Sequence, residues 1–112
     1  MATHYVVTKS RDGQLMFSLK APDGHILLTS GWYGTPSALE GGMEAVRTNS
    51  PLAERYGRLA DDDGKPYFVL KAVNGMVVGR SEAYPSPSAM EEDIARVGGY
   101  AASASIVEEQ EK

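Results

Sequence analysis

Two pairs of hydroxyl side chains are the first candidates for chemistry in this sequence. Ser30 stands three residues before Tyr33, and Ser81 stands three residues before Tyr84. A serine becomes a nucleophile when a neighbouring base activates it, and neither pair has a histidine or lysine placed to do so. We therefore interpret both tyrosines as structural residues that close over a helix end, and we assign no catalytic residue.

Metal binding and thiol chemistry have little support. Residues 61–63 are three aspartates followed by Gly64, but position 65 is lysine and no later glutamate has the spacing of a calcium-binding loop. His4 and His25, the two histidines, fall on different predicted strands without a carboxylate motif. The sequence has no cysteine, which excludes disulfides, thiolate nucleophiles and iron–sulfur clusters. We expect no metal and no cofactor.

Length and composition indicate one small globular domain. The chain has 112 residues, of which 42% are hydrophobic and 23% charged. No run approaches the roughly 20 apolar residues that span a bilayer, and the N-terminus has no basic segment followed by an apolar one. We therefore expect a cytoplasmic protein without a membrane partner. The formal net charge of −4 opposes a general nucleic-acid binder.

An internal repeat organises the chain. Residues 12–46 align without a gap to residues 63–97, and 14 of the 35 positions are identical at an offset of 51. The chain is therefore a tandem duplication, with repeat one at about 4–51 and repeat two at about 55–107. We predict a single domain over residues 1–107, followed by a flexible acidic tail at 108–112.

Each repeat contains a predicted hairpin. Residues 15–21 alternate between apolar and polar types, as residues 67–72 do, and this period is typical of a half-buried strand. Asp23-Gly24 and Asn74-Gly75 follow directly. These dipeptides favour a two-residue type I′ turn, in which both central residues have positive φ.

A helix follows each hairpin. Thr35-Pro36 and Ser86-Pro87 have the pattern of an N-cap followed by proline, whereas capping boxes that begin at Ser37 and Ser88 offer a second start. The sequence does not choose between them. We expect the first helix to end by Ser50-Pro51 and the second at Gly98-Gly99.

The remaining segments complete the predicted sheet. Further strands are expected at His4–Lys9, at 55–59 and at 100–107. One helix over three strands leaves too little core for one repeat, so both repeats should share one sheet with both helices on one face.

The doubled pattern resembles the YegP-like family of small bacterial proteins, a domain of unknown function. The shared residues in each copy are Asp-Gly, Phe-x-Leu-Lys-Ala, an Asp-Gly or Asn-Gly turn, Ser-x-x-Tyr and a Ser-Ala helix start. The resemblance implies an α+β fold of two β-β-β-α-β units in a single, mostly antiparallel sheet, with C-terminal strands exchanged between the repeats. It implies no activity or cofactor. The copies differ at Gly42, whose match is Asp93, and at His25, whose match is Met76.

The sheet face away from the helices is the candidate site. A two-residue turn would pair Lys20 with Leu27 and Lys71 with Val78 on that face. This face has more apolar residues than an ordinary solvent-exposed sheet face, and contiguous apolar surface commonly marks an interaction site. The candidate partner-binding residues are Lys20, Leu27, Tyr67, Lys71, Val78 and Arg80.

The molecular function cannot be read from the sequence. Our first hypothesis is a non-catalytic interaction or accessory module that contacts an unidentified protein partner through this face. A small-ligand-binding protein or a modest enzyme using the Tyr/Ser loops is the alternative, and a single-stranded nucleic-acid binder using Tyr67 and Trp32 is less favoured. We expect a monomer, with weak self-association through the open face as the exception.

Overall fold

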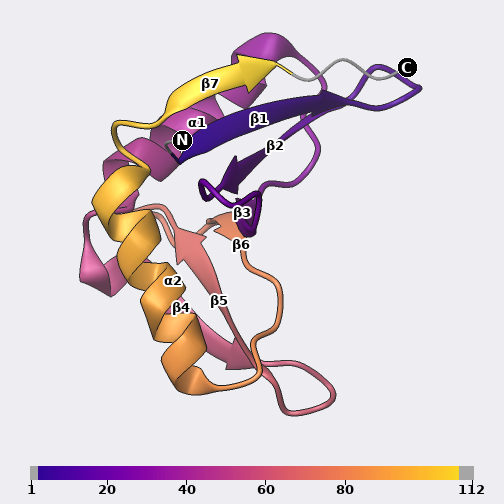
Figure 1. Ribbon diagram of the computed structural model, residues 1–112. Coiled ribbons are helices and arrows are strands. Elements are labelled where there is room, and N and C mark those ends of the chain that lie inside the picture. Colours follow the sequence, from indigo (N-terminus) through magenta and orange to yellow (C-terminus); the bar gives the residue numbers. More distant parts are fainter. Residues whose placement is uncertain (1–2, 109–112) are drawn as a thin grey trace.

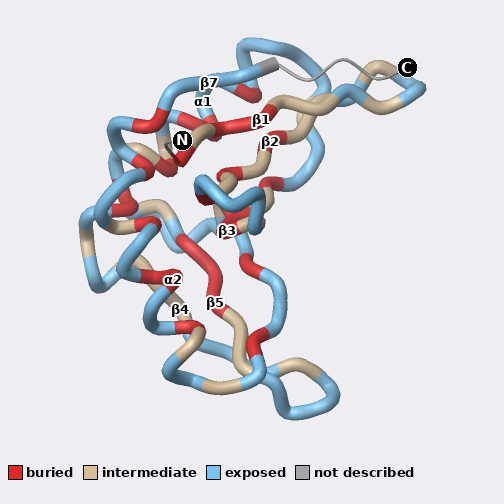
Figure 2. Tube along the Cα trace, viewed as in Figure 1, coloured by how far each residue is buried: buried red, intermediate tan, exposed pale blue. Residues whose placement is uncertain are grey.

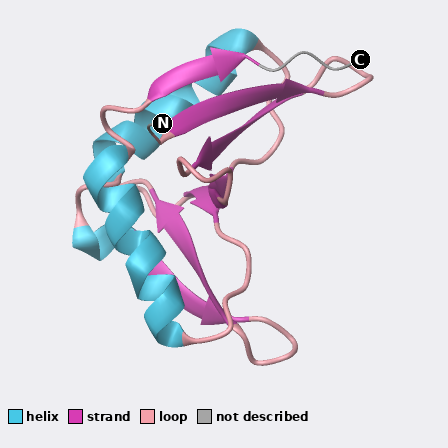
Figure 3. Cartoon of the chain, viewed as in Figure 1, coloured by secondary structure: helices cyan, strands magenta, loops and turns pink. Residues whose placement is uncertain are grey.

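The computed structural model describes residues 3–108, which form a seven-stranded sheet with two α-helices on one face (Figures 1 and 3). The first repeat comprises β1 (His4–Lys9), β2 (Leu15–Lys20), β3 (Ile26–Thr29) and α1 (Pro36–Asn49). A 3-10 helix, η1 (Ala53–Arg55), leads into the second repeat, which comprises β4 (Tyr56–Ala60), β5 (Pro66–Lys71), β6 (Val77–Arg80), α2 (Pro87–Tyr100) and β7 (Ser105–Glu108). The predicted α+β fold is confirmed. Of the expected acidic tail, Glu108 ends β7 and the rest lies outside the described residues.

The strand order joins the two repeats into one sheet. The strands follow one another as β4-β5-β6-β3-β2-β1-β7. β3 and β6 pair antiparallel at the centre, with Thr29 opposite Arg80. On each side of this junction the strands form antiparallel hairpins, β1-β2-β3 in one repeat and β4-β5-β6 in the other. The sheet therefore has approximate twofold symmetry, and β7 is added to it at one edge.

The exchange of terminal strands occurs once within the described chain. After α2 the chain crosses to the first repeat, where β7 pairs parallel with β1 and Ile106 lies opposite Tyr5. After α1 the chain instead passes through η1 directly into β4. At the repeat offset of 51, the positions that match β7 are residues 54–57, which already serve as η1 and β4. The same stretch therefore cannot also form a separate terminal strand.

The hairpins close through a three-residue loop, one residue longer than the type I′ turn that we expected. The Gly24 N–H donates to the Ala21 carbonyl at 2.9 Å, and the Ala21 N–H donates to the His25 carbonyl at 2.8 Å. Gly24 has φ +88°, whereas no described residue other than glycine has a positive φ. Asp23 therefore lacks the conformation that a type I′ turn requires, and the pattern is a type I turn followed by a glycine bulge. Pro22, whose ring holds φ near −65°, favours this turn.

The bulge shifts the strand register beside each turn. Lys20 lies opposite Ile26 instead of Leu27, and in the second repeat Lys71 lies opposite Val77. A bulge places two residues of one strand opposite one of its neighbour and re-aims a side chain. Leu27 is fully buried and belongs to the hydrophobic core.

The structure selects the earlier of the two possible helix starts. The Ala38 N–H donates to the Thr35 hydroxyl at 3.1 Å, and the Ala89 N–H donates to the Ser86 hydroxyl at 3.2 Å. Each cap satisfies a backbone donor that the first helical turn leaves free. Proline then occupies the first helical position, where its missing N–H costs nothing.

α2 continues beyond its expected end at Gly98-Gly99. It ends at Tyr100, whereas α1 ends at Asn49 as predicted. A Cβ at Gly98 would lie 3.4 Å from the Ser50 carbonyl oxygen. This is an ordinary van der Waals distance, and neither Gly98 nor Gly99 has the positive φ typical of a glycine that ends a helix, so α2 continues past both.

Each helix packs on strands of both repeats. α1 contacts β2, β5 and β6, and α2 contacts β3 and β5. The Tyr5 hydroxyl donates to the carbonyl of Ala101, the C-cap residue that follows α2, at 2.7 Å. The Tyr56 hydroxyl donates to the carbonyl of Ser50, the C-cap residue that follows α1, also at 2.7 Å. Burial raises the pKa of Tyr5 to about 12, so its hydroxyl remains a donor at neutral pH.

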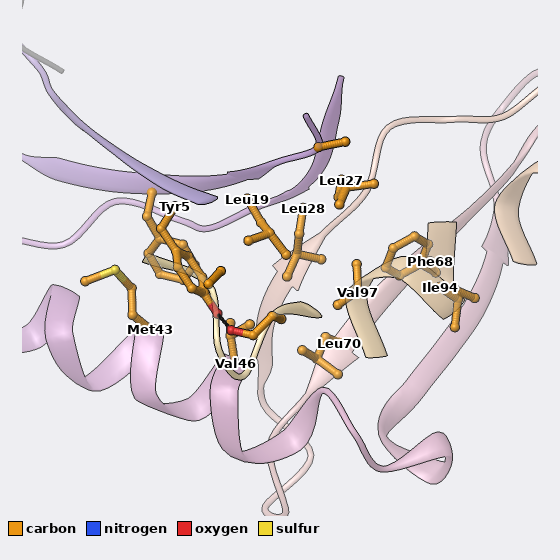
Figure 4. Close-up of a cluster of buried hydrophobic side chains, with 14 of the residues drawn as sticks. Tyr5, Leu19, Leu27, Leu28, Met43, Val46, Phe68, Leu70, Ile94 and Val97 are labelled. Atoms are coloured by element: carbon orange, nitrogen blue, oxygen red, sulfur yellow. Dashed lines mark hydrogen bonds between the residues drawn. The ribbon is translucent and has the colours of Figure 1, made fainter. Parts of the chain in front are cut away.

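One continuous core lies between the sheet and the helices (Figure 2). Phe17 packs edge-on against Tyr5, with 5.9 Å between ring centroids, and stacks on Tyr33 at 6.3 Å. Phe68 makes equivalent contacts with the matching tyrosines at 5.9 and 6.2 Å. Figure 4 shows buried side chains of both repeats meeting in this core. Neither repeat therefore has a core of its own.

Neighbouring glycines of α1 should respond oppositely to alanine. A Cβ at Gly42 would lie 2.2 Å from the Tyr33 hydroxyl oxygen, whereas a Cβ at Gly41 meets nothing within 4 Å. We expect Gly42→Ala to lower the free energy of unfolding by about 1–3 kcal/mol through overpacking, and Gly41→Ala to raise it by about 0.5–1 kcal/mol through helix propensity. Urea unfolding of both variants measures this. Equal effects would contradict the close contact.

Candidate functional site

The face of the sheet opposite the helices, which we call the open face, carries four of the candidate residues. Phe68 and Leu70 of β5 are buried in the core, so the alternating Tyr67 and Lys71 point to the open face. The same alternation places Lys20 of β2 on this face. Arg80 of β6 completes the set, and we call Lys20, Tyr67, Lys71 and Arg80 the open-face cluster.

Tyr67 and Arg80 are in direct contact. The Arg80 guanidinium lies 5.2 Å from the centroid of the Tyr67 ring, within the range of a cation–π interaction. Val69 lies opposite Arg80 in the register, on the same face of β5 as Tyr67, and its side chain is buried. Arg80 itself is exposed and Tyr67 half-buried. The pair therefore places an aromatic ring and a positively charged guanidinium next to each other on the open face.

The two lysines flank this pair from different repeats. Lys71 lies four residues beyond Tyr67 on β5, and its Cε would be 3.4 Å from a Cβ at Gly57. Its aliphatic stem therefore packs along β4 while its ammonium group reaches solvent. Lys20 is half-buried on β2. No described carboxylate lies within ion-pair distance of Lys20, Lys71 or Arg80.

Charge is divided between the sheet and the rest of the protein. Strands β1 to β6 contain five lysine or arginine residues and no aspartate or glutamate. One of the five, Arg58, is paired with Glu91 of α2, with 2.5 and 2.9 Å between the bonded atoms. The other described acidic side chains lie in turns, helices and η1. The open face is therefore positive although the whole chain carries a net charge of −4.

Two of the six candidate residues are less available than we expected. Leu27 is buried in the core, because the glycine bulge shifts it out of the expected pairing with Lys20. Val78 is half-buried and packs against the core. The expectation that Leu27 is accessible on the open face is therefore corrected, and a partner would meet mainly the open-face cluster.

The serine hydroxyls of both loops form hydrogen bonds with the backbone. The Ser30 hydroxyl accepts the Phe17 N–H at 2.9 Å and donates to the Gly31 carbonyl at 2.7 Å. Ser81 makes the matching bonds with Phe68 and Glu82 at 2.9 and 2.8 Å. Each serine thus completes backbone pairing where a strand ends. This geometry fits the structural interpretation of both pairs.

A polar cluster that the sequence analysis did not assemble joins the repeats. The His25 Nε2 lies 2.5 Å from Asp93 Oδ2, although the two residues are 68 positions apart. The Tyr84 hydroxyl donates to the same carboxylate oxygen at 2.8 Å, and Arg96 donates to Oδ1. His25 belongs to the first repeat and the other three to the second. Three donors from two repeats therefore bind one carboxylate whose side chain is 3% exposed.

The differences between the repeats point to this cluster. His25 and Asp93 occupy two of the positions at which the copies differ, since their matches are Met76 and Gly42. In the first repeat Gly42 leaves room for the Tyr33 hydroxyl, whereas in the second Asp93 accepts the tyrosine. Two departures that compensate each other signal a contact. Sequence reasoning noted both without connecting them.

The electrostatics of the cluster favour an ionised Asp93. Burial is the largest single effect and opposes ionisation, but hydrogen bonds from His25, Tyr84 and Arg96 together outweigh it and lower the pKa of the carboxyl below its ordinary value of 3.8. The carboxylate also raises the pKa of Tyr84, which burial already raises. An ionised carboxylate accepts hydrogen bonds only, so His25 Nε2 carries the proton. The arrangement is a lock between repeats in which both carboxylate oxygens accept hydrogen bonds.

Residues 3–108 contain neither a candidate metal site nor a helix that could span a membrane. No described cluster of three or more histidine, aspartate and glutamate side chains is arranged to hold a metal ion. No described helix has the length and apolar character that crossing a membrane requires.

Comparisons with known proteins agree with the repeat and the fold. A family model described as a domain of unknown function (DUF1508) matches residues 10–56 and 61–108. The UPF0339 protein YegP of Yersinia pestis is 43% identical over 94 residues, 84% of each chain. The protein of the same name from Escherichia coli K12 is 41% identical over 97 residues, 87% of this chain and 88% of the relative.

Solved structures show the same fold. A solution NMR structure of YegP from E. coli, described as a protein of unknown function, has a TM-score of 0.90 and 37% identity, covering 100% of this chain and 97% of that chain. A UPF0339 protein from Shewanella oneidensis has a TM-score of 0.90 at 36% identity, covering 98% and 93%. The function of these relatives is not established.

The lock between the repeats predicts a pH-dependent stability. We expect Asp93→Asn to lower the free energy of unfolding by about 1–3 kcal/mol near neutral pH, because a charged acceptor of three hydrogen bonds is lost. Since the folded-state pKa of Asp93 lies below 3.8, this stabilisation is complete above that value and is lost as the pH falls through the folded-state pKa. The difference between wild type and variant should therefore shrink in acid.

Chemical unfolding at neutral pH and at about pH 3 measures this difference. Glu92→Gln is the matched control, because Glu92 is exposed and lies 3.9 Å from Arg96; its effect should stay within about 0.5 kcal/mol. A difference between wild type and Asp93→Asn that does not change with pH would contradict an ionised Asp93.

Proposed function

This chain belongs to the DUF1508 family, the YegP-like proteins of unknown function, and from that premise we propose that it is a non-catalytic interaction module whose open face binds an acidic surface of a protein partner. The proposal rests on one observation. The open-face cluster presents three cations that no described carboxylate neutralises, on a chain whose net charge is −4.

Two properties of the cluster support a protein partner. Unpaired cations attract an acidic surface and exclude a basic one, which gives speed and specificity to association. The Tyr67 and Arg80 pair adds an aromatic and a guanidinium group, the types enriched at the centres of protein interfaces. Hydration of these groups in the free protein is compatible with reversible binding.

The serine and carboxylate groups that could act in catalysis already form hydrogen bonds within the fold, which supports a non-catalytic role. Both serine hydroxyls complete backbone hydrogen bonds, and both oxygens of the Asp93 carboxylate already accept hydrogen bonds. A nucleophile needs a free, activated hydroxyl, and a general base needs an acceptor that is not already in use. A modest enzyme built on the Tyr/Ser loops is therefore the less supported alternative.

We keep two sequence expectations as part of the proposal. The protein acts in the cytoplasm, and it is a monomer because its duplicated repeats already supply both halves of the sheet. Weak self-association through the open face is the alternative, and light scattering over a range of protein concentrations distinguishes the two.

Charge reversal tests the open face. We expect Lys20→Glu/Lys71→Glu to weaken binding of the captured partner at least tenfold, because each substitution replaces attraction with repulsion. Affinity capture from a bacterial lysate, followed by measurement with the purified partner, gives this ratio. Binding of the wild type should also weaken as salt is raised toward about 0.5 M, since exposed charges are screened.

The matched control is Lys9→Glu/Lys65→Glu, which changes the net charge equally at two exposed positions outside the cluster. It should retain the partner. Loss of binding in both double variants, or in neither, would refute the open face as the site. Salt-sensitive retention of single-stranded nucleic acid without a protein would favour the nucleic-acid alternative, and a bound metabolite would favour the small-ligand alternative.

A further inference from the structure

The two outer edges of the sheet are matched in sequence but differ in their neighbours. β1 forms one edge of the duplicated hairpins and is covered by β7. β4 occupies the matching place in the second repeat and ends the sheet, with no described strand beside it. An edge strand presents unpaired backbone N–H and C=O groups that accept another strand.

β4 repeats the local structure that lets β1 accept β7. Tyr5 pairs with Leu19, and Tyr56 pairs with Leu70 in the same antiparallel register. Both tyrosines donate to the C-cap carbonyl of a helix, at the same distance of 2.7 Å. The bonds fix the direction and height of each strand relative to the helices. The free side of β4 therefore has the geometry of a side that is known to bind a parallel strand in this molecule.

The β1–β7 register indicates what the β4 edge would place beside a strand. On β1, Ile106 lies opposite Tyr5 and Glu108 opposite Val7. At the repeat offset of 51, the residues matching Tyr5 and Val7 are Tyr56 and Arg58. A strand bound in the same register would place one residue, apolar in β7, beside Tyr56. It would place the residue two positions later beside the cation Arg58. An acidic residue is the complement of that cation.

Arg58 has capacity for a second carboxylate. Its Nε and one terminal nitrogen bind Glu91, which leaves the other terminal nitrogen, and the Arg58 side chain is 46% exposed. Leu59 next to it is 47% exposed, so apolar surface accompanies the charge along the edge. Arg55, just before the strand, is already engaged, because it donates to Asn49 and lies 3.9 Å from Glu54.

We propose that the edge of β4 binds an extended acidic segment of a partner polypeptide, which adds to the sheet as a parallel eighth strand. The backbone of β4 supplies the affinity and Arg58 selects a carboxylate, as in other cases of strand addition. The partner is a different polypeptide. A β7 donated by a second copy would have to leave its own β1, exchanging one pairing for another without a net gain. This proposal does not rest on the function of the open face.

A peptide with the sequence of residues 103–109, SASIVEE, is the defined probe, because it contains residues 105–108, which form β7 on the matching edge. We expect the peptide, added to the isotope-labelled full chain, to shift NMR resonances of Tyr56–Ala60 and β5 and to slow amide exchange in β4. N-methylation of the Ile and Val amides should weaken binding at least tenfold, because it removes the pairing hydrogen bonds whichever amide faces β4.

Substitutions in the protein separate the edge from other sites. Arg58→Gln should weaken binding of the peptide threefold to tenfold, whereas Arg11→Gln, in the exposed turn after β1, should leave it unchanged. No resonance shifts, shifts confined to β1 and β7, or binding that survives N-methylation would overturn the proposal. Lys20→Glu/Lys71→Glu tests the open face separately, so failure of one site leaves the other measurable.

Discussion

The packing of each helix across both repeats is the constraint on which the rest of the structure depends. A repeat of about 50 residues with one helix has too little apolar surface to fold alone, so α1 and α2 complete a shared core. The hydroxyls of Tyr5 and Tyr56 fix this arrangement, because each donates to the C-cap carbonyl of the helix in the other repeat. Tyr5 of the first repeat binds the C-cap of α2, and Tyr56 of the second repeat binds the C-cap of α1. Loss of one contact therefore affects both repeats, and the duplicated chain behaves as one structural unit.

Departures from the repeat symmetry account for the specific features of this protein. Arg47 of α1 stacks on the Tyr5 ring at 5.0 Å and donates to the carbonyls of Ala102 and Ala104 at 3.4 and 2.8 Å, which holds the segment leading to β7. Its match in α2 is Gly98, which makes no such bonds. The arginine thus braces the edge that is filled, whereas the edge of β4 stays open. Symmetry provides two equivalent edges, and single substitutions make them different.

The same separation of roles is visible in the charges. The helices and turns carry most of the acidic residues, whereas three of the strand cations, Lys20, Lys71 and Arg80, lie on the open face. The buried Asp93 differs, because three donors from two repeats compensate its charge. The buried Asp93 has hydrogen-bond donors within the fold, whereas the cations of the open-face cluster have no described carboxylate partner. This difference is the physical reason for proposing that a partner binds at the open face.

Local sequence determined the elements of this fold, and tertiary contacts decided how they are completed. Alternation and helix caps establish the strands and helices, since each of these signals depends on neighbours within a few residues. The repeat at an offset of 51 residues then indicates that both copies share one sheet. The turn type was mispredicted because Asp-Gly and Asn-Gly also fit a three-residue loop that ends in glycine, and the end of α2 because Gly98 and Gly99 do not adopt the positive φ of a glycine that ends a helix. The open-face lysines follow from alternation, but the burial of Leu27 follows from a bulge and the His25–Asp93 lock from long-range packing. One sequence cannot show which distant residues meet, because that depends on the summed burial of the whole core.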